Sequence, residues 1–386
     1  MTDVSPTSSL TSPGTKSAEV PELRPAVFDD YAQIEKLEST HDLLTLSATD
    51  WRALYTENPV NRLLSQDRAI GWVLVDSKQR IVGSLANIIQ RYMYRGTDLI
   101  AATGRAWVVA EEYRGIAIWL IDEYFNQPGV DLFLNTTVNS MAVDPFTSFG
   151  SSKVPVGDWE SAAYWITNYL GFARVALKLK KVPAASLFSP LVGLGLRAKD
   201  CVASHSIPVP NAQYQISELP GFGNEFDRFW QELVGLNTNK LMGFRDSQSL
   251  TWHFTTPLRH NHLWIVTARK NNLMRAYGIF KRQDHPPSGL TRMRLVDFQT
   301  VEPADSTLLT SILHHAHKKC RAQKIHTLEH VGCNLPKTQR LDQLAPYRRQ
   351  LPAWPFYYAA ADPSLDAALK SPDAWDASTY DGDSSL

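Results

Sequence analysis

The alternation of apolar and polar positions changes period several times along the first half of the chain. The stretch LRPAVFDDYAQIEKLE, beginning at Leu23, predicts a short strand, an acidic turn and a helix with apolar positions at Tyr31, Ile34 and Leu37. Three β-rich runs separated by polar turns follow between residues 71 and 112, and they indicate an antiparallel meander. VVAEEYRGIAIWLIDEYF then predicts a strand end, a turn and a helix, and VDLFLNTTVN predicts another strand. This order of elements is typical of an α+β fold.

The second half of the chain echoes the first. From Asn139, at the end of a predicted strand, to Trp159 is twenty residues, and from Asn334 to Trp354 is also twenty. WRALYTENP followed by WVLVDSKQRIVGSL is matched in the same order by TWHFTTP followed by WIVTARKNNLMRAYGI. Several echoes in one order predict two copies of one fold, with Asn139 equivalent to Asn334 and Trp159 to Trp354.

Composition divides the chain into five parts. Residues 1–22 are rich in Ser, Thr and Pro and predict a disordered leader, residues 182–210 predict a linker between two domains, and residues 366–386 predict an acidic tail. The domains themselves are expected at 23–181 and 211–365. The linker contains the apolar patch LFSPLVGLGL, which is open to two interpretations, contact with a membrane or packing between the domains; we expect packing.

Charge and cysteine content narrow the classes of partner. The chain has 39 Lys and Arg and 39 Asp and Glu, so its composition gives no reason to expect nucleic acid or an anionic membrane as the main partner. Cys201, Cys320 and Cys333 have no CxxC spacing, which indicates a reducing compartment. No apolar run reaches spanning length, and the first residues lack a signal pattern. We therefore expect a cytoplasmic protein without stable membrane insertion.

The turn from Glu112 to Ala117 has the composition of an anion site. A strand that leads directly into a helix presents unpaired backbone N–H groups at the positive end of the helix dipole, where phosphate binds. Gly115 allows an anion to approach the backbone, Ala117 keeps the first helical turn slim, and Arg114 can add charge-assisted hydrogen bonds. Ordinary helix capping is the alternative interpretation.

In its order of elements and in the sequence EEYRGIA, the chain resembles the GNAT superfamily of acyl-CoA N-acyltransferases, whose fourth strand leads to a pyrophosphate-binding turn of the pattern Gln/Arg-x-x-Gly-x-Gly/Ala. One register places Gly115 and Ala117 on the small positions and Glu112 on the first, and we favour it. The other places Arg114 on the first position and Trp119 on the last. The resemblance implies two tandem GNAT-like domains, each a mixed, mostly antiparallel sheet flanked by helices, and acetyl-CoA or another acyl-CoA as the donor. The residues implied to contact it are Val108, Val109, Tyr113, Arg114, Gly115, Ile116, Ala117 and Asn139.

The resemblance continues downstream, with departures. In NSMAVDPFTSFGS, Asn139 and Ala142 fit a family pattern that ends in Leu-Tyr, but Phe146 stands in place of the Tyr; a rival register over NYLGF puts Thr167 there. In the family this Tyr returns a proton to the leaving thiolate, so the usual general acid is absent. In the second half EPADS replaces the turn, so we expect that copy to be degenerate and to have lost cofactor binding.

Acyl transfer from a thioester to an amine needs a polarised carbonyl, a neutral amine and a proton acceptor. The resemblance assigns the backbone N–H groups of Val108 and Val109 to the thioester. Glu112, with Glu111 as the alternate, is the predicted base, because partial burial at the strand end would make a carboxylate more basic. Capping of the following helix is the other interpretation of both residues.

These observations predict an N-acyltransferase, in the simplest case an N-acetyltransferase, that moves an acyl group from acyl-CoA to a small-molecule primary amine by direct attack. The second domain is expected to complete the acceptor cleft or a homodimer contact. Two other functions stay open. One is aminoacyl-tRNA-dependent transfer on the same fold, which needs a basic groove that the balanced charge argues against. The other is a non-catalytic acyl-CoA-binding module, favoured by the missing Tyr. Neither nucleic acid nor a metal ion is expected.

Overall fold

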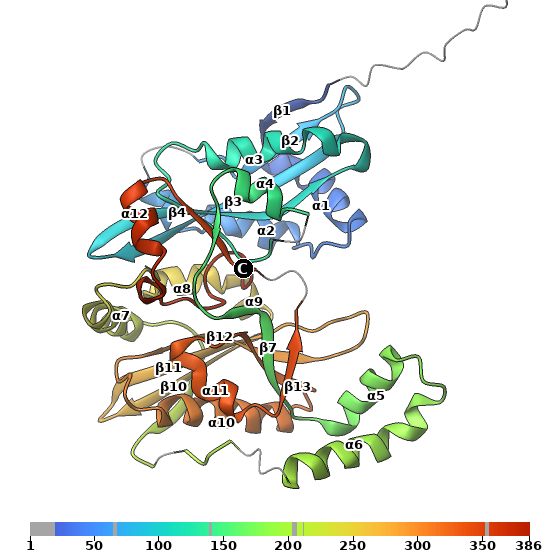
Figure 1. Cartoon of the computed structure of the whole chain (residues 1–386), viewed down its shortest axis with the longest axis vertical. Helices are drawn as coiled ribbons and strands as arrows, with labels where there is room; N and C mark the ends of the chain where they lie inside the picture. The colour runs from blue at the N-terminus through green and yellow to red at the C-terminus, as the bar shows by residue number, and fades with distance from the viewer. Residues whose placement is uncertain (1–19, 65–67, 139–140, 203–206, 211, 352–354) are drawn as a thin grey trace, which may run out of the picture.

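The computed structural model describes residues 20–64, 68–138, 141–202, 207–210, 212–351 and 355–386. These residues form two domains stacked on one another, each a twisted sheet with helices on both faces (Figure 1). Almost all of the predicted leader, and both Asn139 and Trp354, lie outside the described residues, so the leader and those two equivalences stay predictions.

The sheet of the first domain runs in the order β1-β2-β3-β4-β5-β15-β6. Its strands are β1 (Glu22–Pro25), β2 (Gly71–Val75), β3 (Ile81–Tyr94), β4 (Thr97–Val109), β5 (Leu132–Asn135), β15 (Tyr357–Ala360) and β6 (Ser152–Lys153), and the short β9 (Met242–Gly243) pairs with β3. Only the β4–β5 pairing is parallel among these described strands. The three long runs of the predicted meander are β2, β3 and β4.

The sheet of the second domain has the same plan. Its order is β8-β10-β11-β12-β13-β7-β14, formed by β8 (Gln215–Leu219), β10 (Leu263–Lys270), β11 (Leu273–Arg282), β12 (Arg292–Thr300), β13 (Thr327–Cys333), β7 (Asp158–Ile166) and β14 (Tyr347–Gln350). Again one described pair, β12–β13, is parallel and the rest are antiparallel. The predicted fold class, two mixed and mostly antiparallel sheets flanked by helices, is confirmed.

The two sheets exchange strands. Strand β7 follows the first domain in the chain but lies between β13 and β14, and β15 comes near the end of the chain but lies beside β5. The predicted boundaries at 23–181 and 211–365 therefore do not follow sheet membership. A cut near residue 181 would remove β15 from the first sheet and leave β7 without its neighbours.

Alternating residues of each strand bury opposite faces of the sheets. In β2, Trp72 and Leu74 pack toward α3 (Ile118–Phe125) and α4 (Val143–Ser148), whereas Val73 and Val75 pack toward α1 (Tyr31–Thr40) and α2 (Ala48–Thr56). The second domain repeats this arrangement with α10 and α11 on one face and α7, α8 and α9 on the other. The bounds of these helices are Thr307–Ala322, Gln339–Leu344, Glu225–Leu236, Ser247–His253 and Thr255–Arg259, and the 3-10 helices are η1 (Phe28–Asp30), η2 (Val60–Arg62), η3 (Glu111–Ile116), η4 (Pro336–Thr338) and η5 (Pro372–Ala374).

The predicted linker is mostly helical. Helix α6 occupies Ala185–Val202 and packs against α5 (Tyr169–Leu179) as a hairpin that projects from the second domain (Figure 1). The expected packing of LFSPLVGLGL between the domains is wrong, because its large side chains are exposed and α6 meets α5 through small residues. Within the described residues, no helix is long and apolar enough to cross a membrane.

The predicted acidic tail is also corrected. After α12 (Pro363–Leu369) the chain runs between the two sheets and ends near the middle of the molecule (Figure 1). Trp375 and Tyr380 are buried there. The acidic groups tolerate burial because they are hydrogen-bonded: the Asp381 carboxylate accepts from the Tyr92 hydroxyl at 3.0 Å and from the Ser378 backbone N–H at 2.8 Å.

A buried ion pair lies beneath this segment. Arg245 and Asp297 have side chains with 0% exposure, and Arg245 Nε donates to Asp297 Oδ2 at 2.9 Å. Ser378 Oγ and Tyr277 Oη donate to the same carboxylate at 3.0 Å each. Burial opposes ionisation of Asp297, but the charges of Arg245 and Lys337, together with the hydrogen bonds from Arg245 and Ser378, outweigh it and lower the pKa of Asp297. The pair ties β12 to the C-terminal segment, which in turn contacts the first sheet.

Candidate active site

The parallel pairing of β4 with β5 ends abruptly. It extends over Ala101 and Ala102 only, and the next backbone N–H, that of Gly104, donates instead to the Tyr124 hydroxyl at 3.0 Å and to Asn135 Oδ1 at 3.1 Å. The Tyr124 hydroxyl donates to Ala102 O at 2.9 Å. Two side chains thus replace the backbone ladder. We call residues 104–109 of β4, together with residues 135–137 at the end of β5 and directly after it, the β4–β5 separation.

A β-bulge in β4 changes the direction of its backbone N–H groups at the β4–β5 separation. The register between β3 and β4 shifts between Ser84 and Ala86, and Ala106 has a φ of 53°. The Ala110 N–H donates to Val82 O of β3 at 2.8 Å. Because successive residues of a strand present their N–H groups to opposite edges, Val109 directs its N–H away from β3 and toward the separation. Val108, by the same alternation, faces β3.

Two buried N–H donors at the β4–β5 separation have no partner among the described residues: Asn135 Nδ2 and Trp107 Nε1. Trp107 packs against the ring of Phe146, with centroids 6.1 Å apart. An unsatisfied buried donor costs about 1–3 kcal/mol, so such groups are usually paired in a functional state. Two donors without acceptors beside an open strand edge suit a ligand with carbonyl oxygens, as a thioester on a pantetheine arm has.

The predicted turn is the 3-10 helix η3, which leads directly into α3. Gly115 and Arg114 are exposed, and a Cβ at Gly115 would meet nothing within 4 Å, so the outer side of the turn has room for a ligand. Tyr113, Ile116 and Ala117 are half-buried against the core.

The burial that we expected for Glu111 and Glu112 is wrong. Both are exposed on η3, where they lie at the start of a helical segment and complement its positive end. The structure therefore does not show the burial on which their assignment as base rested. Their assignment as base stays a prediction.

The sequence interpretation overlooked a hydroxyl at the site. Phe146 is buried at 4% exposure and supplies none. Tyr124, on the buried face of α3, supplies one directly at the β4–β5 separation, and burial raises its pKa above the ordinary value. The helical spacing of Leu120 and Tyr124 indicated burial, but no local signal indicated that the hydroxyl would meet the end of the strand ladder.

The C-terminal segment also contacts the β4–β5 separation. Asp383 accepts from Thr136 Oγ1 at 2.7 Å and from Thr137 Oγ1 at 2.5 Å, directly after Asn135. Gly382 has a φ of 70°, and a Cβ there would lie 2.6 Å from Thr136 Cγ2, so this approach requires glycine. Thr137 is exposed, which places the Asp383 carboxylate at the border of the separation with solvent.

The second domain contributes positive charge beside this segment. Lys281 of β11 donates to the backbone oxygen of Ser385 at 2.7 Å. Burial lowers the pKa of Lys281 to about 8, and the neighbouring charges of Arg105 and Arg294 add to the effect. Arg105 belongs to β4, one residue after Gly104, so the two domains meet at the β4–β5 separation.

In the second domain, the C-terminal segment lies beside the strand edge that corresponds to the β4–β5 separation. Beyond the parallel pairing of β12 with β13, Thr379 Oγ1 donates to Val296 O at 2.9 Å. Before α10, Glu302 and Asp305 accept from the Tyr214 hydroxyl at 2.6 and 2.7 Å. These carboxylates precede α10 in the chain as η3 precedes α3 in the first domain, and the loss of cofactor binding in the second copy stays a prediction.

Two mixed sheets of one strand order, each with a single described parallel pair that opens beyond a few residues, define a tandem GNAT-like fold. Similar solved structures include N-myristoyltransferase of Saccharomyces cerevisiae with bound myristoyl-CoA (TM-score 0.56, 11% identity, 92% of this chain and 81% of that chain). A GCN5-related N-acetyltransferase from Anabaena variabilis matches with a TM-score of 0.53 and 12% identity over 88% of this chain and 73% of that chain. A probable N-acyltransferase from Enterococcus faecalis matches with a TM-score of 0.54 and 9% identity over 88% and 72%.

These matches span both domains, and at such identities they establish the fold. No protein-family model matches the sequence, and a search of curated proteins finds no significant similarity.

Proposed function

We propose that the protein is an acyl-CoA-dependent N-acyltransferase that transfers its acyl group to a primary amine. The observation that carries the proposal is the pair of buried donors at the β4–β5 separation, Asn135 Nδ2 and Trp107 Nε1, that have no acceptor within the described parts of the chain. The fold supports it, since the similar structures include an N-acetyltransferase and an N-myristoyltransferase with bound myristoyl-CoA. Acetyl-CoA is the simplest donor, and a small-molecule amine is the proposed acceptor.

In this proposal the thioester lies along the free edge of β4 and the pyrophosphate lies at the exposed side of the turn near Arg114 and Gly115. The amine nitrogen attacks the thioester carbon, the Val109 N–H stabilises the oxyanion that forms, and the C–S bond breaks to release the CoA thiolate. The amine loses a proton to a base. No covalent intermediate with the protein is required, and three free cysteines, at 201, 320 and 333, agree with the cytoplasmic location that we propose.

Binding is the first test of this proposal. Calorimetry with CoA, acetyl-CoA and longer acyl-CoA esters is expected to show a single site, and a thiol-release assay with pooled amines is then expected to show turnover. Absence of binding at millimolar ligand contradicts the proposal. Binding without thiol release favours the second candidate, a non-catalytic acyl-CoA-binding module, for which the absence of a hydroxyl on Phe146 is the supporting observation.

The base has two sets of candidates. Glu112 and Glu111 come from the sequence, whereas the structure adds Asp383, which borders the β4–β5 separation. We propose Asp383, because both glutamates are exposed on η3. We expect Asp383→Asn to slow turnover by at least about tenfold, the low end of what loss of a general base costs, with Glu111→Gln and Glu112→Gln close to wild type.

The rate against pH separates a base from a merely structural carboxylate. Wild type is expected to lose activity on the acidic side, where the base or the acceptor amine gains a proton, and the profile of Asp383→Asn is expected to differ from that of wild type there. No alkaline fall is expected, because Phe146 has no hydroxyl and the proton of the Tyr124 hydroxyl is donated to Ala102 O, so the thiolate leaves unprotonated. A free thiol has a pKa of about 8.5. A tenfold loss in Glu112→Gln with an unchanged Asp383→Asn would restore the original assignment.

A further inference from the structure

In the hairpin of α5 and α6, helix α6 buries small residues and exposes large apolar ones, the opposite of an ordinary surface helix. The residues of α6 that are buried against α5 include Ala185, Ser189 and Gly193, spaced four apart. A Cβ on Gly193 would lie 3.1 Å from the Tyr169 backbone oxygen, so the helices approach closely. Small residues form the contact, and the large apolar side chains of α6 are left for the opposite side.

That opposite side is an exposed apolar face. Leu187, Leu191 and Leu194 are 75%, 71% and 64% exposed, and Phe188 and Val192 flank them. At 3.6 residues per turn Leu187, Leu191 and Leu194 lie on the side opposite the buried stripe, and Phe188 and Val192 extend this apolar surface toward one edge of the stripe. We call them the α6 apolar face. A soluble helix normally directs its polar side outward, so an exposed face of this kind marks an interaction surface.

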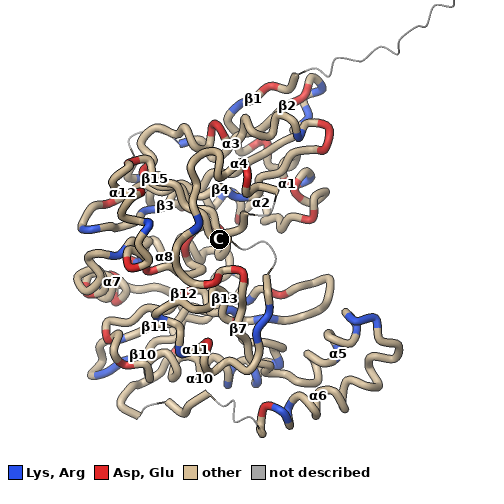
Figure 2. Tube along the Cα trace, in the orientation of Figure 1, with Lys and Arg blue, Asp and Glu red and all other residues tan. Residues whose placement is uncertain are grey.

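The hairpin is also strongly positive. Residues 168–202 contain six cations, Arg174, Lys178, Lys180, Lys181, Arg197 and Lys199, and one anion, Asp200, in a chain with equal numbers of each overall. Asp200 is used internally, since it accepts from the hydroxyls of Tyr169 and Tyr347 at 2.8 and 2.7 Å and so fixes the hairpin to the second domain. Figure 2 shows Lys and Arg at both ends of the hairpin.

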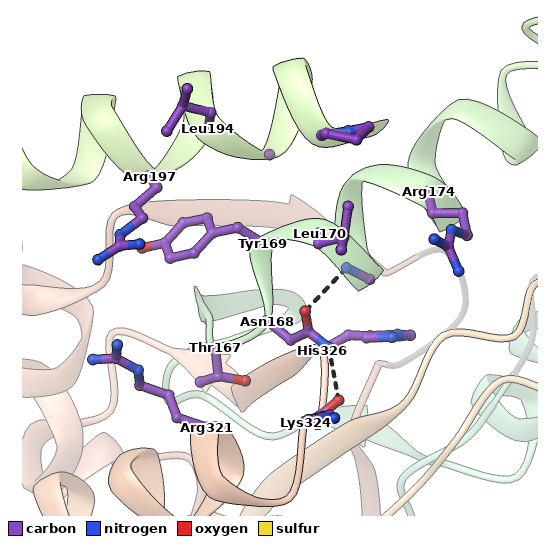
Figure 3. Close-up of a pocket in the computed structure, with 13 residues that line it drawn as sticks. Thr167, Asn168, Tyr169, Leu170, Arg174, Leu194, Arg197, Arg321, Lys324 and His326 are labelled. Atoms are coloured by element: carbon purple, nitrogen blue, oxygen red, sulfur yellow. Dashed lines mark hydrogen bonds between the residues drawn. The ribbon is translucent and has the colours of Figure 1, made fainter. Parts of the chain in front are cut away.

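A cavity of about 820 Å³ lies where the hairpin meets the second domain, and it combines the same two features (Figure 3). Leu170 and Leu194 form part of its apolar wall. Arg174, Arg197, Arg321 and Lys324 also line it, and within the described parts of the chain no carboxylate is in ion-pair distance of these four cations. Cations without carboxylate partners beside leucine side chains suit a phosphate attached to a hydrocarbon chain.

We propose that the α5–α6 hairpin docks the protein on the surface of an anionic phospholipid bilayer. The α6 apolar face enters the boundary between headgroups and acyl chains, the cations contact headgroup phosphates, and the cavity holds one headgroup. Charge decides between this occupant and a second copy of the chain, because two hairpins of the same positive charge repel each other. The proposal does not depend on the acyltransferase activity.

The experiment is co-sedimentation of the full chain with vesicles. Binding is expected with vesicles that contain phosphatidylserine, is expected to weaken as salt is raised, and is expected to be absent with phosphatidylcholine alone. Leu187→Ser with Leu191→Ser, and separately Lys180→Glu with Lys181→Glu, are each expected to weaken binding by roughly tenfold or more. Leu273→Ser, at another exposed leucine, and Lys370→Glu, outside the hairpin, are the matched controls and are expected to bind as wild type.

Three results would overturn the proposal. The first is equal binding by the hairpin variants and the controls. The second is binding of inorganic phosphate, measured by calorimetry, without any binding to anionic vesicles. The third is a wild-type protein that does not bind vesicles but forms a dimer in sedimentation velocity, with the dimer abolished by Leu187→Ser with Leu191→Ser. The α6 apolar face would then be a surface for self-association.

Discussion

Gly115→Glu is expected to abolish acyl-CoA binding without disturbing the fold. The expectation combines two observations: Gly115 is exposed on η3 next to the N-terminus of α3, and a Cβ there would touch nothing within 4 Å. The new side chain is therefore accommodated sterically in the free protein. In the complex it would put a negative charge beside the pyrophosphate, where two unit charges about 4 Å apart near a protein surface repel by about 4 kcal/mol. Even half of that, after screening by salt, exceeds a tenfold loss of affinity.

Calorimetry with acetyl-CoA and thermal unfolding of the free protein together check this result. Gly223→Glu is the matched control, since Gly223 is also exposed with nothing within 4 Å of a Cβ but lies before α7 in the second domain. Affinity unchanged in Gly115→Glu would place the pyrophosphate elsewhere. A similar loss in both variants would point to a general effect of added charge.

Arg245→Ala is expected to destabilise the protein by roughly 3–5 kcal/mol, because it leaves the carboxylate of Asp297 buried and without its counter-charge. The guanidinium also donates to Gly243 O at 2.8 Å and lies 4.6 Å from the ring centroid of Tyr380, so its loss weakens the contact of the C-terminal segment with β12 as well. Denaturant unfolding of the whole chain measures the change.

Lys370→Ala is the control for this prediction. Lys370 and Asp366 form an ion pair whose side chains are 65% and 30% exposed, and exposed pairs contribute about 0–1 kcal/mol. A loss for Arg245→Ala no greater than that of the control would show that the buried pair does not hold the domains together.

The sequence predicted what is encoded locally. The period-two pattern from residue 71 to 109 became β2, β3 and β4, and the apolar spacing of Leu120, Ile121 and Tyr124 became α3. The order of these elements indicated an α+β fold, and the resemblance to the GNAT superfamily together with the internal repeat implied the two tandem sheets. The turn at Gly115 was also recognisable, because its residues are consecutive in the sequence.

Features that depend on distant partners were not predictable. The sequences of β7 and β15 do not indicate which sheet each strand joins, because their pattern of side chains fits a strand of either sheet. The acidic C-terminal segment resembled a solvated tail because the hydroxyls that pair with Asp381 and Asp383 belong to residues more than two hundred positions earlier. Pro190 and the Gly-Leu-Gly-Leu sequence resembled a linker, although α6 accommodates both.

The exchange of β7 and β15 has a consequence for synthesis of the chain. A ribosome releases β5 long before residues 357–360 exist, so the first sheet keeps an unpaired edge at β5 until those residues have been made. Strand β7 emerges without β13 and must wait for the second domain. Both edges are exposed in any product that stops early, and unpaired strand edges favour aggregation and recognition by quality control. Prematurely terminated chains are therefore expected to be cleared, and the two sheets are complete only once β14 and β15 have been made.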